Sequence, residues 1–355
     1  MGQRPLMKKL SKIVARFAVV GAAMGVLWQG GGAGAQAPPA PQQEDLADMQ
    51  VAPPQLRLSD ATHTVHILPT RNGAFAHAVV QAPTGPLVYN GGPVMTGSVT
   101  TYAIFWVPPR LQTGALTNLG PYYQTVQKNL LTDYPGHGLG SNNTQYFQTV
   151  GGITTYIQNQ GTFGGFYVDT APYPPSGCND SATPGNCITD DQIQAEIQKV
   201  MALQGWTGGL NKMFFLFTSS GEGSCFDASS TSCAYVQYCA YHGYFYSGST
   251  PVIYANQPFG NPSACQVFGT PVPNGAVAAD TAATAVSHEL TEALTDPLLN
   301  AWYTATGYEI GDLCAYSYGV NTWDAGQANQ MWNGHFYELQ QEWNNHTSAC
   351  VQLGP

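Results

Sequence analysis

The sequence predicts an α/β protein in which a mixed sheet backs one long helix and disulfides pin the loops. From about residue 100 onward, strand-like apolar runs alternate with amphipathic segments of helical period. All eight cysteines also lie in this part of the chain. With 40 Gly, 25 Pro and only 9% charged residues, the composition is typical of a rigid extracellular protein with long ordered loops, not of a disordered one.

The predicted elements follow one another along the chain. Apolar or alternating runs predict strands at 62–68, 101–107, 212–218, 241–246 and 251–255. Helical periodicity predicts helices at 119–131, 190–204 and about 276–296. The second helix begins with Asp190, which is favourable in a first turn, and Pro297 ends the third.

The two faces of the helix predicted at 276–296 differ in chemistry. At 100° per residue, its alanines share one side with Val286, Leu290 and Leu294, and we expect this side to pack on the sheet. The opposite side collects polar residues, namely Thr281, Thr284, His288, Thr291, Glu292 and Thr295. This polar face is therefore predicted to form the floor of a cleft.

The first 35 residues have the pattern of a secretory signal. They hold five of the eleven basic residues and no acidic one, and a short apolar run at 17–28 precedes the small-residue pattern at 33–35. That run is too short to span a bilayer, so stable membrane insertion is not expected and the chain is predicted to be secreted or periplasmic. Residues 36–85, which begin rich in Pro, Gln and Ala, are predicted to be a tether or a pro-segment, and residues 86–355 the folded domain.

The exported part of the chain is strongly acidic. Six Lys and Arg remain after the signal, against 21 Asp and Glu. Nucleic acid is therefore not expected as a partner.

An even number of cysteines in an exported chain predicts disulfides. Short spacings favour the pairs Cys178 with Cys187 and Cys225 with Cys233, which leaves Cys239 with Cys265 and Cys314 with Cys350. Spacing alone leaves this connectivity open. A cysteine zinc site is not favoured, because no paired C-x-x-C occurs.

The segment 287–296 places an imidazole and two carboxylates at one-turn spacing. Residues four apart on a helix lie one above the other, so His288 and Glu292 can contact one ion while Glu289 flanks it. The arrangement matches the H-E-x-x-H zinc motif, except that Glu292 replaces the second His. The sequence therefore predicts a metal site on this helix.

Further ligands must come from elsewhere, because catalytic zinc takes three protein groups and a water. Glu309 is favoured for its longer side chain, and Asp312 is an alternate ligand or an acceptor that orients His288; these two roles are interchangeable. Asp296 is a third candidate, although its place before Pro297 favours a turn. Zinc is the favoured ion, and a site so rich in carboxylates also admits Mn²⁺ or Ca²⁺.

If the site is catalytic, Glu289 would act as general base on a metal-bound water that attacks a peptide carbonyl. Tyr308 and His242 are candidate oxyanion donors, and His335 is a weaker one. Two other interpretations remain: the ion is purely structural, or the helix holds no ion. The aromatic stretch 239–245 could stack on sugars, although alternating aromatics are more typical of sheet packing.

From about Asn90 onward the chain resembles the phosphate-induced protein 1, or Exordium-like, family of secreted proteins. The resemblance rests on Asn90-Gly-Gly-Pro93 before the strand at 101–106, on 221–225 leading to 239–243, and on 295–303 with the closing Cys350. It implies an extracellular location. Plant members are linked to cell expansion and growth signalling at the wall, and this chain differs from them at its His-Glu helix, which resembles bacterial relatives with a zincin-like helix.

The same helix also resembles zincins of the gluzincin type, in which a downstream Glu supplies the third ligand. Here Glu309 lies seventeen residues past Glu292, and Asp312 twenty. This resemblance implies a zincin-like sheet behind an active-site helix, and a secreted zinc peptidase acting on peptides or proteins. The alternative is a non-catalytic extracellular or wall-associated protein with a structural metal and wall polysaccharide as its partner.

Overall fold

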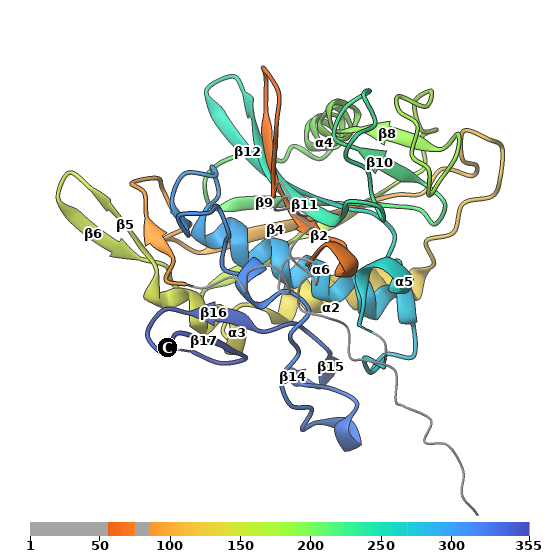
Figure 1. The fold of residues 1–355 in the computed structure, drawn as a ribbon. Helices are drawn as coiled ribbons and strands as arrows, with labels where there is room; N and C mark the ends of the chain where they lie inside the picture. The colour runs from red at the N-terminus through yellow and green to blue at the C-terminus, as the bar shows by residue number, and fades with distance from the viewer. Residues whose placement is uncertain (1–55, 75–84, 268, 355) are drawn as a thin grey trace, which may run out of the picture. The chain divides into compact units, whose positions relative to one another are not determined.

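A seven-stranded mixed sheet of order β1-β2-β11-β12-β9-β4-β7 forms the centre of the fold (Figure 1). The computed structural model describes residues 56–74, 85–267 and 269–354. The strands are Arg57–Ser59 (β1), Thr64–Pro69 (β2), Tyr238–Ser247 (β11), Thr250–Gln257 (β12), Lys212–Thr218 (β9), Val99–Trp106 (β4) and Gly161–Asp169 (β7). Neighbours pair antiparallel from β1 to β12 and parallel from β12 to β7. The predicted α/β class with a mixed sheet is confirmed.

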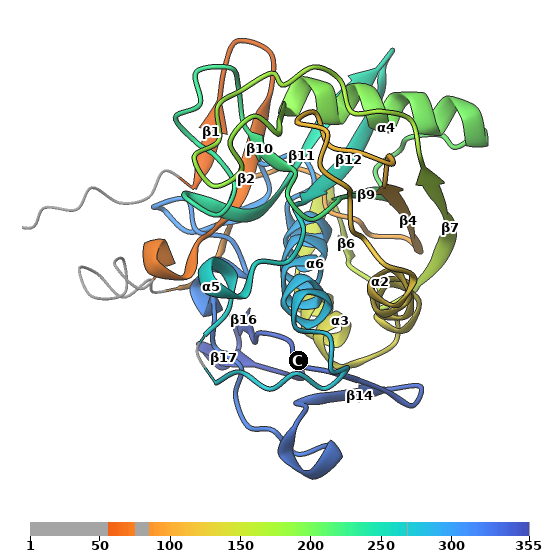
Figure 2. The ribbon, with the colours of Figure 1, turned by 90° about the vertical axis from the view of Figure 1, so that its right-hand side faces the viewer.

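Helices cover both faces of this sheet. Pro121–Asp133 (α2) and Val277–Thr295 (α6) lie on one face, and Asp190–Gln204 (α4) lies on the other (Figure 2). The alternation of β9 serves both layers, because Phe215 and Phe217 join the core with α2 and α6 while Phe214 and Leu216 join the core with α4. A strand covered on both faces reads as a continuous apolar run, as the sequence of β9 does.

The remaining elements are short. They are Val88–Tyr89 (β3), Gly138–Asn142 (α3), Asn143–Gln145 (η1), Phe147–Val150 (β5), Ile153–Tyr156 (β6), Cys187–Thr189 (β8), Gly223–Cys225 (β10), Pro262–Cys265 (α5), Trp302–Tyr303 (β13), Asp312–Cys314 (η2), Asp324–Gly326 (η3), Gln330–Trp332 (β14), His335–Tyr337 (β15), Glu342–Asn344 (β16) and Ala349–Val351 (β17). Most belong to two-stranded hairpins or single turns that surround the main sheet.

The predicted elements agree with the structure, with ends that move by up to three residues. The bounds of α4 and β9 match those predicted. Local signals explain the ends of α4: Thr189 and Gln192 form a capping box, and Gly205 takes the left-handed conformation that closes a helix.

The structure differs from the predicted domain boundary at residue 86. Strand β2 lies within the predicted tether or pro-segment, yet it pairs along β11 in the main sheet, and β1 pairs with β2. Residues 56–69 are therefore an integral part of the domain. The predicted signal at 1–35, and the Pro-rich start of the tether, lie outside the described residues.

Four disulfides join the predicted pairs: Cys178–Cys187, Cys225–Cys233, Cys239–Cys265 and Cys314–Cys350. Such a set forms in an oxidising compartment. Within the described part of the chain, no helix has the length and apolar character needed to cross a membrane.

Helix α6 is buried on all sides, which corrects the predicted open cleft. Every residue from Ala279 to Thr295 is buried. Its apolar side faces the sheet as expected. Its polar side is covered too, since the hydroxyl of Thr284 donates to the carbonyl of Glu338 (2.8 Å), and the hydroxyls of Thr291 and Tyr134 lie 2.7 Å apart. The C-terminal segment therefore closes over the predicted site.

Candidate metal centre

The last turns of α6 carry His288, Glu289 and Glu292, and all three side chains are fully buried. Nε2 of His288 lies 3.1 Å from Oε1 of Glu292, one helical turn away. This contact is the one that the spacing of the motif predicts.

The turn before η2 brings in Glu309 and Asp312, which are also buried. Oδ1 of Asp312 lies 3.9 Å from Nε2 of His288, and the backbone amide of Asp312 donates to Oε1 of Glu292 (3.2 Å). The amide of Glu309 donates to Oδ2 of Asp312 (2.7 Å), so the turn closes on itself. The structure thus brings all four predicted ligand residues into one cluster.

Two histidines from the sheet complete the cluster. His66 on β2 pairs in register with His242 on β11, and both are fully buried. His66 places Nε2 2.7 Å from Oδ2 of Asp312 and Nδ1 3.2 Å from Oε1 of Glu309. His242 places Nδ1 3.1 Å from Oε2 of Glu289.

The role of His66 was not predicted from the sequence. Its position two residues from Thr64 and Leu68, in an alternating strand, was the available signal, because a histidine on the inward face of a strand needs a polar partner. Nothing local indicates that the partners are Glu309 and Asp312, more than 240 residues away.

The predicted oxyanion donors lie in different places. His242 lies among carboxylates, with Nδ1 near Glu289 and Nε2 3.7 Å from Oε2 of Glu309. Tyr308 is half-buried beside the cluster; burial and then the charge of Asp312 raise its pKa. His335 instead pairs with Asp133 on α2 (2.6 Å). The donor role of His335 therefore has no geometric support.

Seven side-chain atoms of the cluster are buried and have no hydrogen-bond partner among the described residues: Nδ1 of His66, Nε2 of His242, Nε2 of His288, Oε1 of Glu289, Oε2 of Glu292, Oε2 of Glu309 and Oδ1 of Asp312. Burying such atoms unpaired is costly, and a cation would satisfy them. Three sets have ligand atoms within 4.8 Å of one another, namely His66, Glu292 and Glu309; His242, Glu289 and Glu292; and His288, Glu292 and Asp312. The residues present therefore fit a divalent metal ion.

The charges of the cluster favour protonated imidazoles when no cation is bound. Burial acts to lower the pKa of His242, but contacts with Glu289 and Glu292 outweigh it and raise that pKa to about 9. The pKa of His288 is likewise raised well above its ordinary value, since the charge of Glu292 overcomes burial. Burial opposes ionisation of Glu292, yet the histidines around it lower its pKa. Burial raises the pKa of Glu289 and of Glu309.

Zinc uptake is therefore expected to release protons, and its affinity is expected to rise with pH up to about 9. The reason is that Zn²⁺ replaces the proton on its ligand His288, and its positive charge beside His242 repels the proton held there. Calorimetric titration in two buffers of different ionisation enthalpy measures the number of protons released. An affinity unchanged between pH 6 and pH 8 would contradict the role of these imidazoles.

The raised pKa of His242 also sets how the stability of the chelated protein depends on pH. The pKa of folded His242 lies above its unfolded value of about 6.5, so its stabilising contribution is complete below about pH 6 and is lost as the pH rises through about 9. Thermal melts of the chelated and zinc-loaded forms should diverge most at high pH.

Gly311 and Gln340 hold the His288 ring. The amide nitrogen of Gln340 donates to the carbonyl of Gly311 (3.0 Å) and lies 2.8 Å from Nδ1 of His288, which leaves Nε2 facing Glu292. A Cβ on Gly311 would stand 2.5 Å from Nδ1 of His288 and 3.0 Å from Oε1 of Glu292. The ring can lie here only because residue 311 has no side chain.

Gly311→Ala is accordingly expected to weaken Zn²⁺ affinity by about 10- to 100-fold, the range seen when groups that orient a ligand are lost. Competition with a chromophoric chelator measures it. Gly120→Ala is the matched control, because nothing lies within 4 Å of a Cβ at that position. Equal affinity in the two variants would show that the ring tolerates displacement.

Arg57 on β1 covers one side of the cluster. Its guanidinium lies 3.2 Å from Oδ2 of Asp296 and 3.5 Å from Oε1 of Glu309, and it stacks on the ring of Tyr303 at 4.4 Å. The side chain of Arg57 is 29% exposed, whereas those of Asp296 and Glu309 are fully buried. Arg57 is therefore one place where solvent reaches the edge of the cluster.

Asp296 acts as a turn residue, as favoured from its place before Pro297. Its Oδ1 accepts from the backbone amides of Asn300 and Ala301, and its Oδ2 pairs with Arg57. With its oxygens engaged in this way, Asp296 is not a ligand candidate.

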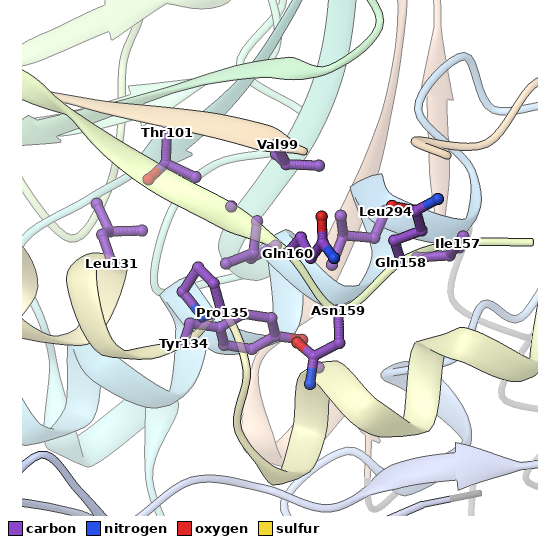
Figure 3. A pocket seen from close by; sticks show the side chains of 13 residues that line it. Val99, Thr101, Leu131, Tyr134, Pro135, Ile157, Gln158, Asn159, Gln160 and Leu294 are labelled. Carbon is purple, nitrogen blue, oxygen red and sulfur yellow. The ribbon is translucent and has the colours of Figure 1, made fainter. Parts of the chain in front are cut away.

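The cavity in Figure 3 is separate from this cluster. It is lined by Val99, Leu131, Tyr134, Leu294 and their neighbours, and its volume of about 20 Å³ holds little more than one water. Leu290 and Leu294 lie two positions after His288 and Glu292 along α6, which turns them to the opposite side of the helix. This cavity is not a substrate site.

The fold and the cluster together define a disulfide-bonded α/β protein with a candidate metal centre. In comparison with known proteins, a 95-residue segment is 33% identical to Protein EXORDIUM-like 3 of Arabidopsis thaliana, covering 22% of this chain and 28% of that protein. The similarity is distant and partial, and it supports the resemblance to Exordium-like proteins noted from the sequence. No family model and no solved structure matches the chain.

Proposed function

We propose that this protein is a secreted, metal-dependent hydrolase of the peptidase kind, with Glu289 as its general base. The observation that carries the proposal is the state of Glu289. Its side chain is fully buried beside the candidate metal ligands, its Oε2 faces His242, and its Oε1 has no hydrogen-bond partner. A carboxylate in this setting is free to accept a proton.

His288, Glu292 and Glu309, together with Asp312, would hold the ion, with zinc favoured. A bound divalent cation polarises a carbonyl group and lowers the pKa of a water molecule. Burial raises the pKa of Glu289 from its ordinary value, which brings this base closer to neutral pH, where general-base catalysis is most efficient. His242 fixes the Glu289 carboxylate at 3.1 Å. A zincin-like relation of sheet and helix belongs to the same proposal.

Substrate access in this proposal runs past Arg57. The carboxylates and imidazoles of the cluster are buried, while the Arg57 side chain is partly exposed and bridges Asp296 and Glu309. In this proposal the guanidinium moves aside to let a peptide carbonyl approach the cluster.

The test is proteolysis by the purified exported protein. An unfolded protein substrate is incubated with the zinc-loaded form, the chelated form and the reconstituted form, and the products are read by mass spectrometry. We expect cleavage that disappears on chelation and returns with Zn²⁺. Glu338→Gln is a suitable control, since Glu338 is a buried carboxylate that bonds to Asn321 away from the cluster. Stoichiometric zinc without cleavage of any peptide would contradict the proposal.

A second candidate function is a non-catalytic extracellular binding protein in which the buried ion is structural. Two observations favour it: within the described residues the side chains of the cluster are buried, and a separate groove of about 500 Å³ lies on the surface. Tyr244 and Tyr246 line that groove together with His63 and Asp191. Aromatic and acidic side chains of this kind can contact sugar rings and hydroxyls, so wall polysaccharide is the proposed partner.

A glycan-binding assay separates the two candidates. Tyr246 is 55% exposed, so Tyr246→Ala should abolish binding to a soluble wall polysaccharide if the groove is the site. His288→Ala should leave that binding intact. Retention of binding by Tyr246→Ala would remove the groove from consideration.

A further inference from the structure

The cluster offers more ligands than one ion can use. Seven unpartnered atoms come from three imidazoles and four carboxylates. A catalytic zinc ion takes three protein groups and a water, and a structural one takes four. One ion would therefore leave several buried polar atoms without a partner, each at a cost in free energy.

The charge of the cluster leads to the same conclusion. Glu289, Glu292, Glu309 and Asp312 are four buried carboxylates in mutual contact through the histidines. In the described part of the chain, Arg57 is the one lysine or arginine that forms an ion pair with any of them. Arg57 also pairs with buried Asp296, so five carboxylates must be balanced. With neutral imidazoles, as metal ligands require, Arg57 and two divalent ions balance them, whereas Arg57 and one divalent ion leave two buried negative charges.

Glu292 lies at the centre of this arrangement and its two oxygens face different partners. Oε1 lies 3.1 Å from Nε2 of His288, while Oε2 has no hydrogen-bond partner and lies 3.5 Å from Nδ1 of His242. A carboxylate oxygen of Glu292 also lies within 4.8 Å of a ligand atom of His66 and of Glu309. All three ligand sets of the cluster include Glu292. A carboxylate with its oxygens turned to two sides is suited to bridging two ions.

We infer that the cluster binds two divalent cations bridged by Glu292. His288 and Asp312 complete the first site, and His66 and Glu309 complete the second. This inference rests on the proposed metal centre and adds the second ion, with His66 as its imidazole ligand. His242 and Glu289 remain as the pair that handles protons.

Asp312 links the two sites. Its Oδ1 is unpartnered and faces His288, while its Oδ2 lies 2.7 Å from Nε2 of His66. When Nε2 of His66 donates to this oxygen, the lone pair of the ring is on Nδ1, which has no hydrogen-bond partner and lies 3.2 Å from Glu309. A carboxylate that fixes the tautomer of an imidazole in this way is a common support for a metal ligand.

The experiment counts ions. The purified full-length exported protein is dialysed against buffered Zn²⁺ and its zinc is measured by plasma mass spectrometry. We expect two ions per chain in the wild type and one in His66→Ala and in His288→Ala. Loading with Mn²⁺ should give a spin-coupled electron paramagnetic resonance spectrum, which His66→Ala converts to that of an isolated ion.

Saturation at one ion per chain, or an unchanged stoichiometry in His66→Ala, would overturn the inference. Glu309→Gln removes a ligand charge with almost no change of shape. This variant tests the second site in place of His66→Ala if His66→Ala does not fold. Glu338→Gln controls for loss of a buried carboxylate elsewhere. Two ions per chain without proteolysis would support this inference and contradict the peptidase proposal. Proteolysis with one ion per chain would support the peptidase proposal and contradict this inference.

Discussion

Glu289→Gln is expected to reduce peptide hydrolysis by about 100- to 10,000-fold, which is the usual contribution of a general base. Glutamine keeps the shape of the side chain, but it cannot accept the proton that Oε1 of Glu289 is placed to receive. The measurement is the initial rate of cleavage of a fluorogenic peptide by zinc-loaded wild type and variant.

The zinc content of Glu289→Gln should stay at the wild-type value, because neither proposed ion depends on Glu289. Glu338→Gln should retain both zinc and activity. If Glu289→Gln loses its zinc, Glu289 is a ligand and not a base. If it retains full activity, the base lies elsewhere.

Removal of the Cys314–Cys350 disulfide by a double Ser substitution is expected to lower the free energy of unfolding by about 4 kcal/mol. The loop it closes spans 36 residues, which is the longest of the four. Chemical denaturation of the chelated protein, fitted to a two-state transition, measures the loss.

The same variant should also weaken Zn²⁺ binding, because Cys314 ends the turn that carries Glu309 and Asp312. The hydrogen bond from the amide of Trp343 to the carbonyl of Ile310 still holds this turn, so the loss of affinity is partial. Removing Cys178–Cys187 is the control: its nine-residue loop supports only about 2.6 kcal/mol, and zinc affinity should not change. Equal zinc affinity in both variants would show that the disulfide does not support the site.

Several parts of the site could be predicted from the sequence because they are local. The spacing of His288 and Glu292 defines a contact on one helix, and the structure contains it. The turn role of Asp296 follows from the proline after it, and the structure shows its carboxylate capping that turn. Short spacings favoured two of the disulfide pairs, Cys178–Cys187 and Cys225–Cys233, and the structure decided the connectivity that the sequence left open.

Other parts depend on contacts between distant segments. His66 reaches Glu309 and Asp312 only because β2 pairs with β11 at the centre of the site. Arg57 reaches Asp296 because β1, which carries Arg57, pairs with β2 at the edge of the same sheet. The strand at 62–68 was predicted, but the prediction of a tether at 36–85 left it outside the domain, because alternation within one segment does not indicate which strand it pairs with.

The sequence by itself determined the α/β class, the long helix and the expectation of disulfides, and it pointed to His288, Glu292, Glu309 and Asp312 as candidate ligands. Periodicity, capping and spacing act within one segment, so the features that depend on them can be predicted without knowledge of the tertiary structure. Only the tertiary structure decided that the polar face of α6 is covered rather than open, and that two more histidines and an arginine join the cluster. Those outcomes depend on which strands pair and which segment covers the helix. The free energy of such long-range contacts comes from residues far apart in the sequence, so no single segment predicts it.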